Sequence, residues 1–172
     1  MNNWKWNSTY DEAENLDWLI LRDGPISKYF SHEILNKDIK SLVNVGYNII
    51  DVNLKNWTIS NYQSKMKDAF EFPQYYGENL AAFGDCLGDL FNNKTTGLVI
   101  VFRQFDAFYE NSKDVSESIL EIIINESWTW LLTGKKLITL IQVDDPDFHI
   151  DKIGGFSPSW NGKEWLNSNR TI

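Results

Sequence analysis

Three apolar segments, separated by segments of helical pattern, most strongly constrain what this chain can fold into. Residues 98–105 begin with a continuous apolar run, Leu-Val-Ile-Val-Phe, as in a strand buried on both faces of a sheet. Residues 47–54 and 137–143 are the other two predicted strands. Helices are predicted between the strands, at residues 61–70, 79–91 and 114–132. Because helical crossovers join parallel strands, we predict an α/β fold with a small, three-stranded, mainly parallel sheet packed with helices.

An N-terminal extension, residues 1–46, is predicted to precede this core, residues 47–143, within a single domain. Its first sixteen residues are polar with scattered aromatic residues, and we expect them to be irregular. Short strands are predicted at 18–21 and 26–30, with the turn-forming sequence Asp-Gly-Pro between them. A helix is predicted at 36–45.

A tail, residues 144–172, follows the core and is expected to be irregular. Its sequence contains Asp-Pro and Gly-Gly pairs, and one short helical turn is predicted around residues 163–165. Three aromatic residues, Phe156, Trp160 and Trp165, suggest that the tail packs back onto the domain.

The net charge of the chain limits the partners that it can bind. The 172 residues carry a formal charge of -8. Nucleic acids and anionic membranes are poor partners, because binding phosphate groups requires clusters of Lys and Arg. A basic protein would be attracted, mainly through a fast and salt-sensitive association rate. Plain solubility is the alternative explanation of the charge.

The cysteine content and the N-terminal sequence predict a cytoplasmic protein. Cys86 is the single cysteine, so no intramolecular disulfide is possible. The N-terminal sequence lacks the apolar core of a signal peptide, and no segment reaches the roughly 20 apolar residues of a membrane span. His32 and His149 lie far apart in sequence and have no metal-site spacing, so we expect no metal or cofactor.

The helix predicted at 79–91 has an apolar face and an acidic face. The apolar face is defined by residues at helical spacing, namely Leu80, Phe83, Leu87, Leu90 and Phe91. The opposite face carries Ala81, Asp85, Gly88 and Asp89. Gly84 and Gly88 each cost the helix about 1 kcal/mol relative to Ala, and small residues around a carboxylate let another surface approach closely. An ordinary solvated helix face is the alternative interpretation.

The loop before this helix favours a binding surface. Between Lys67 and Lys94 there are acidic residues and no basic residue. Tyr75 and Tyr76 cannot easily both be buried, so at least one ring is expected to face solvent or a partner, and Tyr is a favoured interface residue. We further expect Gly77 to adopt a positive φ angle and Asn79 to cap the helix.

The sequence around this loop resembles the signature of the barstar family of ribonuclease inhibitors. The resemblance rests on Phe-Pro-Gln-Tyr-Tyr-Gly-Glu-Asn-Leu at residues 72–80, followed by Phe83 and by Asp-Cys-Leu at residues 85–87. Residues 98–105 resemble the family's second strand, and residues 117–120 resemble the start of its last helix. The resemblance covers about residues 47–143, and the flanks are similar to those of longer family members.

The resemblance implies an inhibitor rather than an enzyme, with a basic extracellular ribonuclease or another nuclease toxin as partner. It further implies a protein that is monomeric when free. The position of Asp85 matches that of the carboxylate that enters the phosphate-binding part of the ribonuclease active site, where Arg, Lys and His can donate charge-assisted hydrogen bonds to it. The positions implied to bind the partner are Tyr75, Tyr76, Gly77, Asn79, Ala81, Gly84, Asp85, Gly88, Asp89 and Asn125.

The chain departs from the family pattern at several of these positions. An interface acid is replaced by Ala81, and interface tryptophans are replaced by Gly84 and Leu90. An acid of the last helix is replaced by Asn125, which has Glu126 beside it. Asp89 is a candidate to compensate. These departures predict a partner different from the enzyme that barstar inhibits.

Other functions stay open on the sequence alone. One is a barstar-like regulator whose partner is not a nuclease. A carbohydrate- or peptide-binding module is suggested by the eight tryptophans and would require a platform of exposed rings. A hydrolase using Glu78 and Asp85 as acid and base would require a cleft that brings His149 near Asp85.

Overall fold

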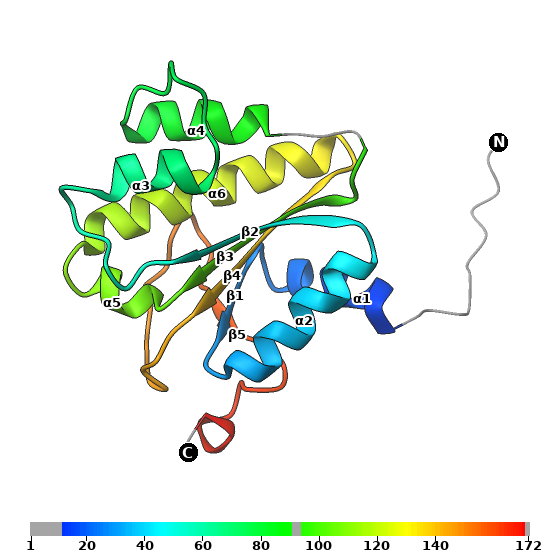
Figure 1. The fold of residues 1–172 in the computed structure, drawn as a ribbon. Coiled ribbons are helices and arrows are strands. Elements are labelled where there is room, and N and C mark those ends of the chain that lie inside the picture. Colours follow the sequence, from blue (N-terminus) through cyan, green and yellow to red (C-terminus); the bar gives the residue numbers. More distant parts are fainter. Residues whose placement is uncertain (1–11, 91–93, 171–172) are drawn as a thin grey trace, which may run out of the picture.

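The computed structural model describes residues 12–90 and 94–170, and it contains a five-stranded parallel sheet (Figure 1). The strands have the spatial order β2-β3-β4-β1-β5, and every neighbouring pair is parallel. Their bounds are β1 Ile26–Tyr29, β2 Tyr47–Asn53, β3 Gly97–Arg103, β4 Lys136–Gln142 and β5 Ser159–Trp160. The predicted α/β class and parallel sheet are confirmed, and the sheet gains one strand from each flank of the chain.

Helices cover both faces of this sheet. One face carries α1 and α2, and the other carries α3, α4, α5 and α6 (Figure 1). Their bounds are α1 Glu12–Arg22, α2 His32–Asn44, α3 Tyr62–Ala69, α4 Leu80–Asp89, α5 Phe105–Tyr109 and α6 Lys113–Leu132. Side chains of β3 alternate between the two cores, with Val99 facing α2 and Ile100 facing the α6 side. This double burial explains the continuous apolar pattern of the strand.

The strand predicted at residues 18–21 is wrong, because this segment belongs to α1. Asp17, Ile20 and Leu21 are buried at helical spacing, whereas Trp18 and Leu19 between them are about half exposed. A short apolar run does not distinguish a strand from one turn of a helix. The expectation of an irregular start is also wrong for residues 12–16, which are helical, while residues 1–11 lie outside the described part.

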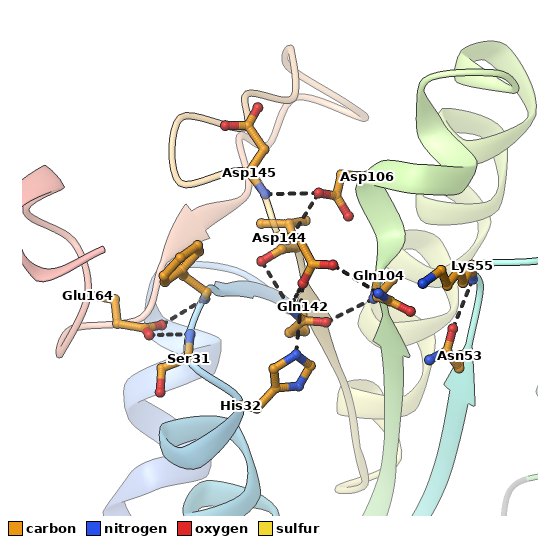
Figure 2. Close-up of polar contacts among 12 residues, drawn as sticks. Ser31, His32, Asn53, Lys55, Gln104, Asp106, Gln142, Asp144, Asp145 and Glu164 are labelled. Carbon is orange, nitrogen blue, oxygen red and sulfur yellow. Dashed lines mark hydrogen bonds and ion pairs between the residues drawn. The ribbon is translucent and has the colours of Figure 1, made fainter. Parts of the chain in front are cut away.

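The tail is more ordered than predicted, since it contains β5 and is anchored by a buried carboxylate. Glu164 is fully buried and accepts hydrogen bonds from the backbone N–H groups of Phe30 (3.0 Å) and Ser31 (2.6 Å), beside the start of α2 (Figure 2). Arg170 donates to the carbonyl of Glu164 (2.7 Å) and lies 4.0 Å from the centre of the Trp160 ring.

Two of the three tail aromatics pack as expected. Phe156 and Trp160 contact the core, but Trp165 is 63% exposed. The predicted helical turn at 163–165 is wrong: residues 162–164 form a hydrogen-bonded turn, and the 3-10 helix η1 Asn167–Asn169 follows it. The N–H of Glu164 bonds to the Asn161 carbonyl, and this turn aims the Glu164 carboxylate at α2.

A buried ionic cluster fastens α1 to the sheet. The Asp17 carboxylate, 4% exposed, accepts hydrogen bonds from the Tyr47 hydroxyl (2.6 Å) and the Lys136 ammonium (2.5 Å). The Lys136 ammonium also lies 4.1 Å from the centre of the Trp18 ring. Burial and the neighbouring Asp17 raise the pKa of Tyr47, so the phenol stays protonated and donates. One carboxylate therefore links α1, β2 and β4.

Replacing Asp17 should strongly destabilise the fold. We expect Asp17→Ala to lower the free energy of unfolding by about 3 kcal/mol, because it leaves the Lys136 charge and the Tyr47 hydroxyl without their buried partner. Urea unfolding followed by circular dichroism measures this. Asp23→Ala is the matched control, since Asp23 forms a solvent-screened, exposed ion pair with Arg22 and should contribute little to stability. Equal losses in the two variants would contradict the proposed role of the cluster.

Candidate functional site

An aromatic cluster holds the loop between α3 and α4 in place. The ring of Phe72 lies 5.3 Å from Phe70, 4.9 Å from Tyr76 and 6.0 Å from Phe83, measured between centroids. Tyr76 is 4% exposed, and its hydroxyl is hydrogen-bonded to the Gln63 side chain. Such packing fixes the loop backbone relative to the core.

The prediction that at least one of the two adjacent tyrosines faces solvent is confirmed, and the other ring is buried. Tyr76 belongs to the aromatic cluster, and burial raises its pKa to about 12. Tyr75 is 76% exposed and presents a large ring to solvent. Tyr75 is thus available to a partner, whereas the structural part played by Tyr76 is to fix the loop.

Asn79 starts α4 as predicted, but the expected positive φ angle is not at Gly77. The Asn79 side chain accepts from the N–H of Ala82 (2.9 Å) and donates to the carbonyl of Gly77 (3.0 Å). The left-handed residue is Glu78, with φ 49°. The positive φ angle therefore occurs one residue later than predicted.

The two faces of α4 agree with the sequence pattern over the described residues. Phe83, Cys86 and Leu87 are buried, and Phe91 lies outside the described part. Burial, together with the charges of Asp89 and Asp85, raises the pKa of the Cys86 thiol, so the sulfur stays protonated and is a poor nucleophile. The opposite face presents the exposed residues Ala81, Asp85 and Asp89.

Gly84 and Gly88 bring α4 close to α6. A Cβ atom added at Gly84 would lie 3.4 Å from Ile122 Cγ2, and one added at Gly88 would lie 3.4 Å from Glu126 Oε2. The sequence suggested that these glycines admit another surface, and α6 of the same chain occupies that space. The spacing of the two helices leaves room at these positions for little more than a methyl group.

This close packing places a further acid, Glu126, beside Asp85. Glu126 is half-buried on α6, and burial and the negative charge of Asp85 both raise its pKa. Asn125, the neighbouring position predicted from the resemblance, is exposed. From the sequence, Glu126 stood out only as the neighbour of Asn125, because its proximity to Asp85 depends on how two helices pack.

We define the acidic surface by five exposed residues of α4, α6 and the preceding loop, together with the half-buried Glu126: Tyr75, Ala81, Asp85, Asp89, Asn125 and Glu126. Within the described residues, its three carboxylates form no salt bridge. Uncompensated carboxylates on a rigid helix can accept charge-assisted hydrogen bonds from Arg or Lys of a partner.

The carboxyl edge of the sheet, where α/β proteins often bind ligands, is filled by its own polar side chains (Figure 2). Gln104, which has φ 50°, donates from its backbone to Gln142 (2.9 Å) and from its side chain to Asp144 (2.9 Å). The hydrogen bond from Gln104 is the main cause that lowers the pKa of Asp144. Asp106 accepts from the backbone N–H groups of Asp144 and Asp145. These bonds hold the start of the tail.

Within the described residues, the geometry gives no support to the alternative sites, and Trp4 and Trp6 lie outside that part of the chain. His149 is highly exposed and pairs with Asp151 rather than Asp85. Trp130 is buried and the Trp160 ring is covered by cations, while Trp128 and Trp165 are exposed on separate elements. No metal-binding cluster of His, Cys, Asp or Glu occurs in residues 12–90 or 94–170.

Comparison with known families gives a match over the central part of the chain. The model of the family described as Barstar (barnase inhibitor) matches residues 52–142, which is more than half of the chain. The matched segment contains β3 and β4, together with α3 to α6 and the last two residues of β2, and therefore all of the acidic surface. The flanking β1 and β5 lie outside it. Among the described helices, none is long and apolar enough to cross a membrane.

Gly84 provides a test of the α4–α6 contact. Gly84→Ala should raise the free energy of unfolding by up to about 1 kcal/mol, because the added methyl group improves helix propensity and meets Ile122 at ordinary contact distance. Gly84→Leu should lower it by about 1–3 kcal/mol, since a longer side chain overfills the contact. Ala81→Leu, on the exposed face of the same helix, should change it by less than about 0.5 kcal/mol. Chemical denaturation of the three variants measures these differences, and a tolerated leucine at position 84 would contradict the close packing.

Proposed function

The chain belongs to the barstar family, and from this premise we propose that it inhibits a basic, secreted ribonuclease or a related nuclease toxin by covering the active site. The observation that carries the proposal is the exposed Asp85 on α4, which lies beside Glu126 and forms no salt bridge within residues 12–90 and 94–170. No cofactor, metal or nucleophile takes part. The protein acts by occupying a site rather than by catalysis.

The physical basis of inhibition is mimicry of a phosphate group. A ribonuclease holds cationic side chains where the substrate phosphate binds, and a carboxylate can accept their hydrogen bonds. The Asn79 cap and the aromatic cluster around Phe72 support a rigid α4, so Asp85 loses little conformational freedom on binding. The net charge of -8 would accelerate encounter with a basic partner.

The departures from the family pattern support a partner that differs from the enzyme that barstar inhibits. Ala81 and Gly84 replace an acid and a tryptophan, which removes charge and ring area from the surface. Asp89 and Glu126 supply acids at other places on the same two helices. We propose that the partner is a distinct toxin. This chain would act as an immunity protein in the cytoplasm of the bacterium that produces the toxin.

Asp85 should dominate recognition. We expect Asp85→Ala to weaken binding at least about a hundredfold, since removing one partner of a desolvated charge pair costs several kcal/mol. The partner is first captured from a lysate of the native host at low and moderate salt, and its dissociation constant is then measured by calorimetry. Asp23→Ala, on the α1 side of the sheet, is a control with the same change in charge.

Either of two results would overturn parts of this assignment. A captured nuclease that binds the Asp85→Ala and Asp23→Ala variants equally would place the binding surface elsewhere. A captured partner without nuclease activity, still dependent on Asp85, would replace the inhibitor by a regulator that uses the same surface.

Glu126 should make the affinity depend on pH. Because its pKa is raised in the free protein, Glu126 binds a proton more readily than an ordinary carboxyl with a pKa of 4.5. Cations of the partner favour the carboxylate, so binding releases that proton. Affinity should therefore rise as the pH rises from 4.5 through the raised pKa. Calorimetry over this range should give a flatter profile for Glu126→Gln and an unchanged one for the exposed control Glu110→Gln. Identical profiles for all three proteins would exclude Glu126 from the interface.

A further inference from the structure

A cavity of about 220 Å³ lies on the face of the sheet opposite the acidic surface. Its walls come from α1, α2, β1, β5 and the turn that follows β5. None of these elements belongs to residues 52–142, which match the barstar family. The cavity is therefore a feature that the flanking segments add to the family core.

One wall of the cavity is apolar and the floor is polar. Leu16, Leu19 and Ile20 of α1 form the apolar wall. The floor is formed by alternate residues of β1, Ser27 and Tyr29, whose side chains point to the same face of the sheet. A ligand that fits both must have an apolar body and a polar edge.

The charged groups that line the cavity cancel in pairs. The Arg22 guanidinium lies 3.2 Å from the Asp23 carboxylate, and the Lys163 ammonium lies 2.7 Å from the Asp38 carboxylate. A charged ligand would have to displace one of these partners. An uncharged ligand leaves both pairs intact, so the lining favours it.

Asp38 supplies a hydrogen-bond acceptor at the polar end. Its carboxylate is buried, and it accepts from Lys163 through Oδ1 and from the Tyr29 hydroxyl through Oδ2 (3.1 Å). A carboxylate has about four acceptor positions, so capacity remains. Since burial and Asp38 raise the pKa of Tyr29 well above its usual range, the tyrosine stays a donor to Asp38. The ligand must therefore also present a donor to use the remaining positions.

The size of the cavity limits the ligand to a single ring with a small substituent. A cavity of about 150 Å³ is known to hold benzene, and this one is moderately larger. We propose that the cavity binds a small, uncharged, single-ring compound with a hydroxyl group that donates to Asp38. This second site is independent of the proposed inhibitor function.

Phenol, anisole and benzoate are suitable probes of the wild-type protein. Titration followed by ¹H–¹⁵N NMR should show phenol shifting the amide signals of Ser27, Ser159 and Gly162. Anisole has the same ring but no donor, and losing one hydrogen bond to a carboxylate should weaken its binding at least about tenfold. Benzoate should bind no more tightly than anisole. Intermolecular NOEs from phenol to the methyl groups of Leu16 and Ile20 would place the ring against α1.

Ser159 offers a variant pair that separates filling the cavity from perturbing the strand. Ser159 lines the cavity beside Ser27, its partner in register on β1. Ser159→Phe should fill the space and abolish phenol binding, whereas Ser159→Ala should keep it. Unchanged phenol binding to a folded Ser159→Phe protein would overturn the proposal. So would equal affinity for phenol and anisole, tighter binding of benzoate, or the absence of NOEs to α1 in the wild-type protein, a result that does not require the variant to fold.

Discussion

The burial of the two central strands on both faces is the constraint on which the other elements depend. β3 and β4 are parallel and almost wholly inaccessible to solvent, so each face of the sheet must be covered by apolar helix faces. α6 covers one face and α2 contributes to the cover of the other. α4 packs chiefly against α6 rather than against the strands. The position of the acidic surface therefore follows from how α6 is seated on the sheet.

The contact between α4 and α6 at Gly84 and Gly88 brings two acidic side chains together. The space at Gly84 and Gly88 admits little more than a methyl group, so α4 lies close to α6, and Glu126 lies beside Asp85. The two carboxylates repel each other, and part of that repulsion appears as the raised pKa of Glu126. A partner that brings cations to this surface relieves the repulsion. Such a partner would offset the local cost of assembling the acids, in keeping with the proposed binding to a basic protein.

The flanking segments complete the sheet and hold themselves by buried polar contacts. β1 adds to the edge of β4, and β5 adds to β1, so the family core is extended without disturbing its three strands. Asp17 and Glu164, both buried, tie α1 to the sheet and the tail to α2. Removing one partner of such a contact strongly destabilises the fold, so the flanks are integral to the folded protein. The same segments enclose the cavity on the α1 side.

The sequence by itself determined the features that depend on local patterns. The apolar runs of β2, β3 and β4, the amphipathic α4, the Asn79 cap and the exposure of one tyrosine of the pair at 75–76 all follow from residue periodicity and side-chain chemistry. These properties are encoded within a few neighbouring residues, so no knowledge of the partners in space was needed.

Only the tertiary structure decided the features that join distant segments. Residues 18–21 are helical because Ile20 and Leu21 are buried in the core that α1 shares with α2. β5 exists because it pairs with the edge of β1, over a hundred residues away in sequence. The proximity of Glu126 to Asp85 likewise depends on the packing of α4 against α6. Pairing and packing across such separations are set by the shape of the whole core, and that information is absent from any local stretch of the chain.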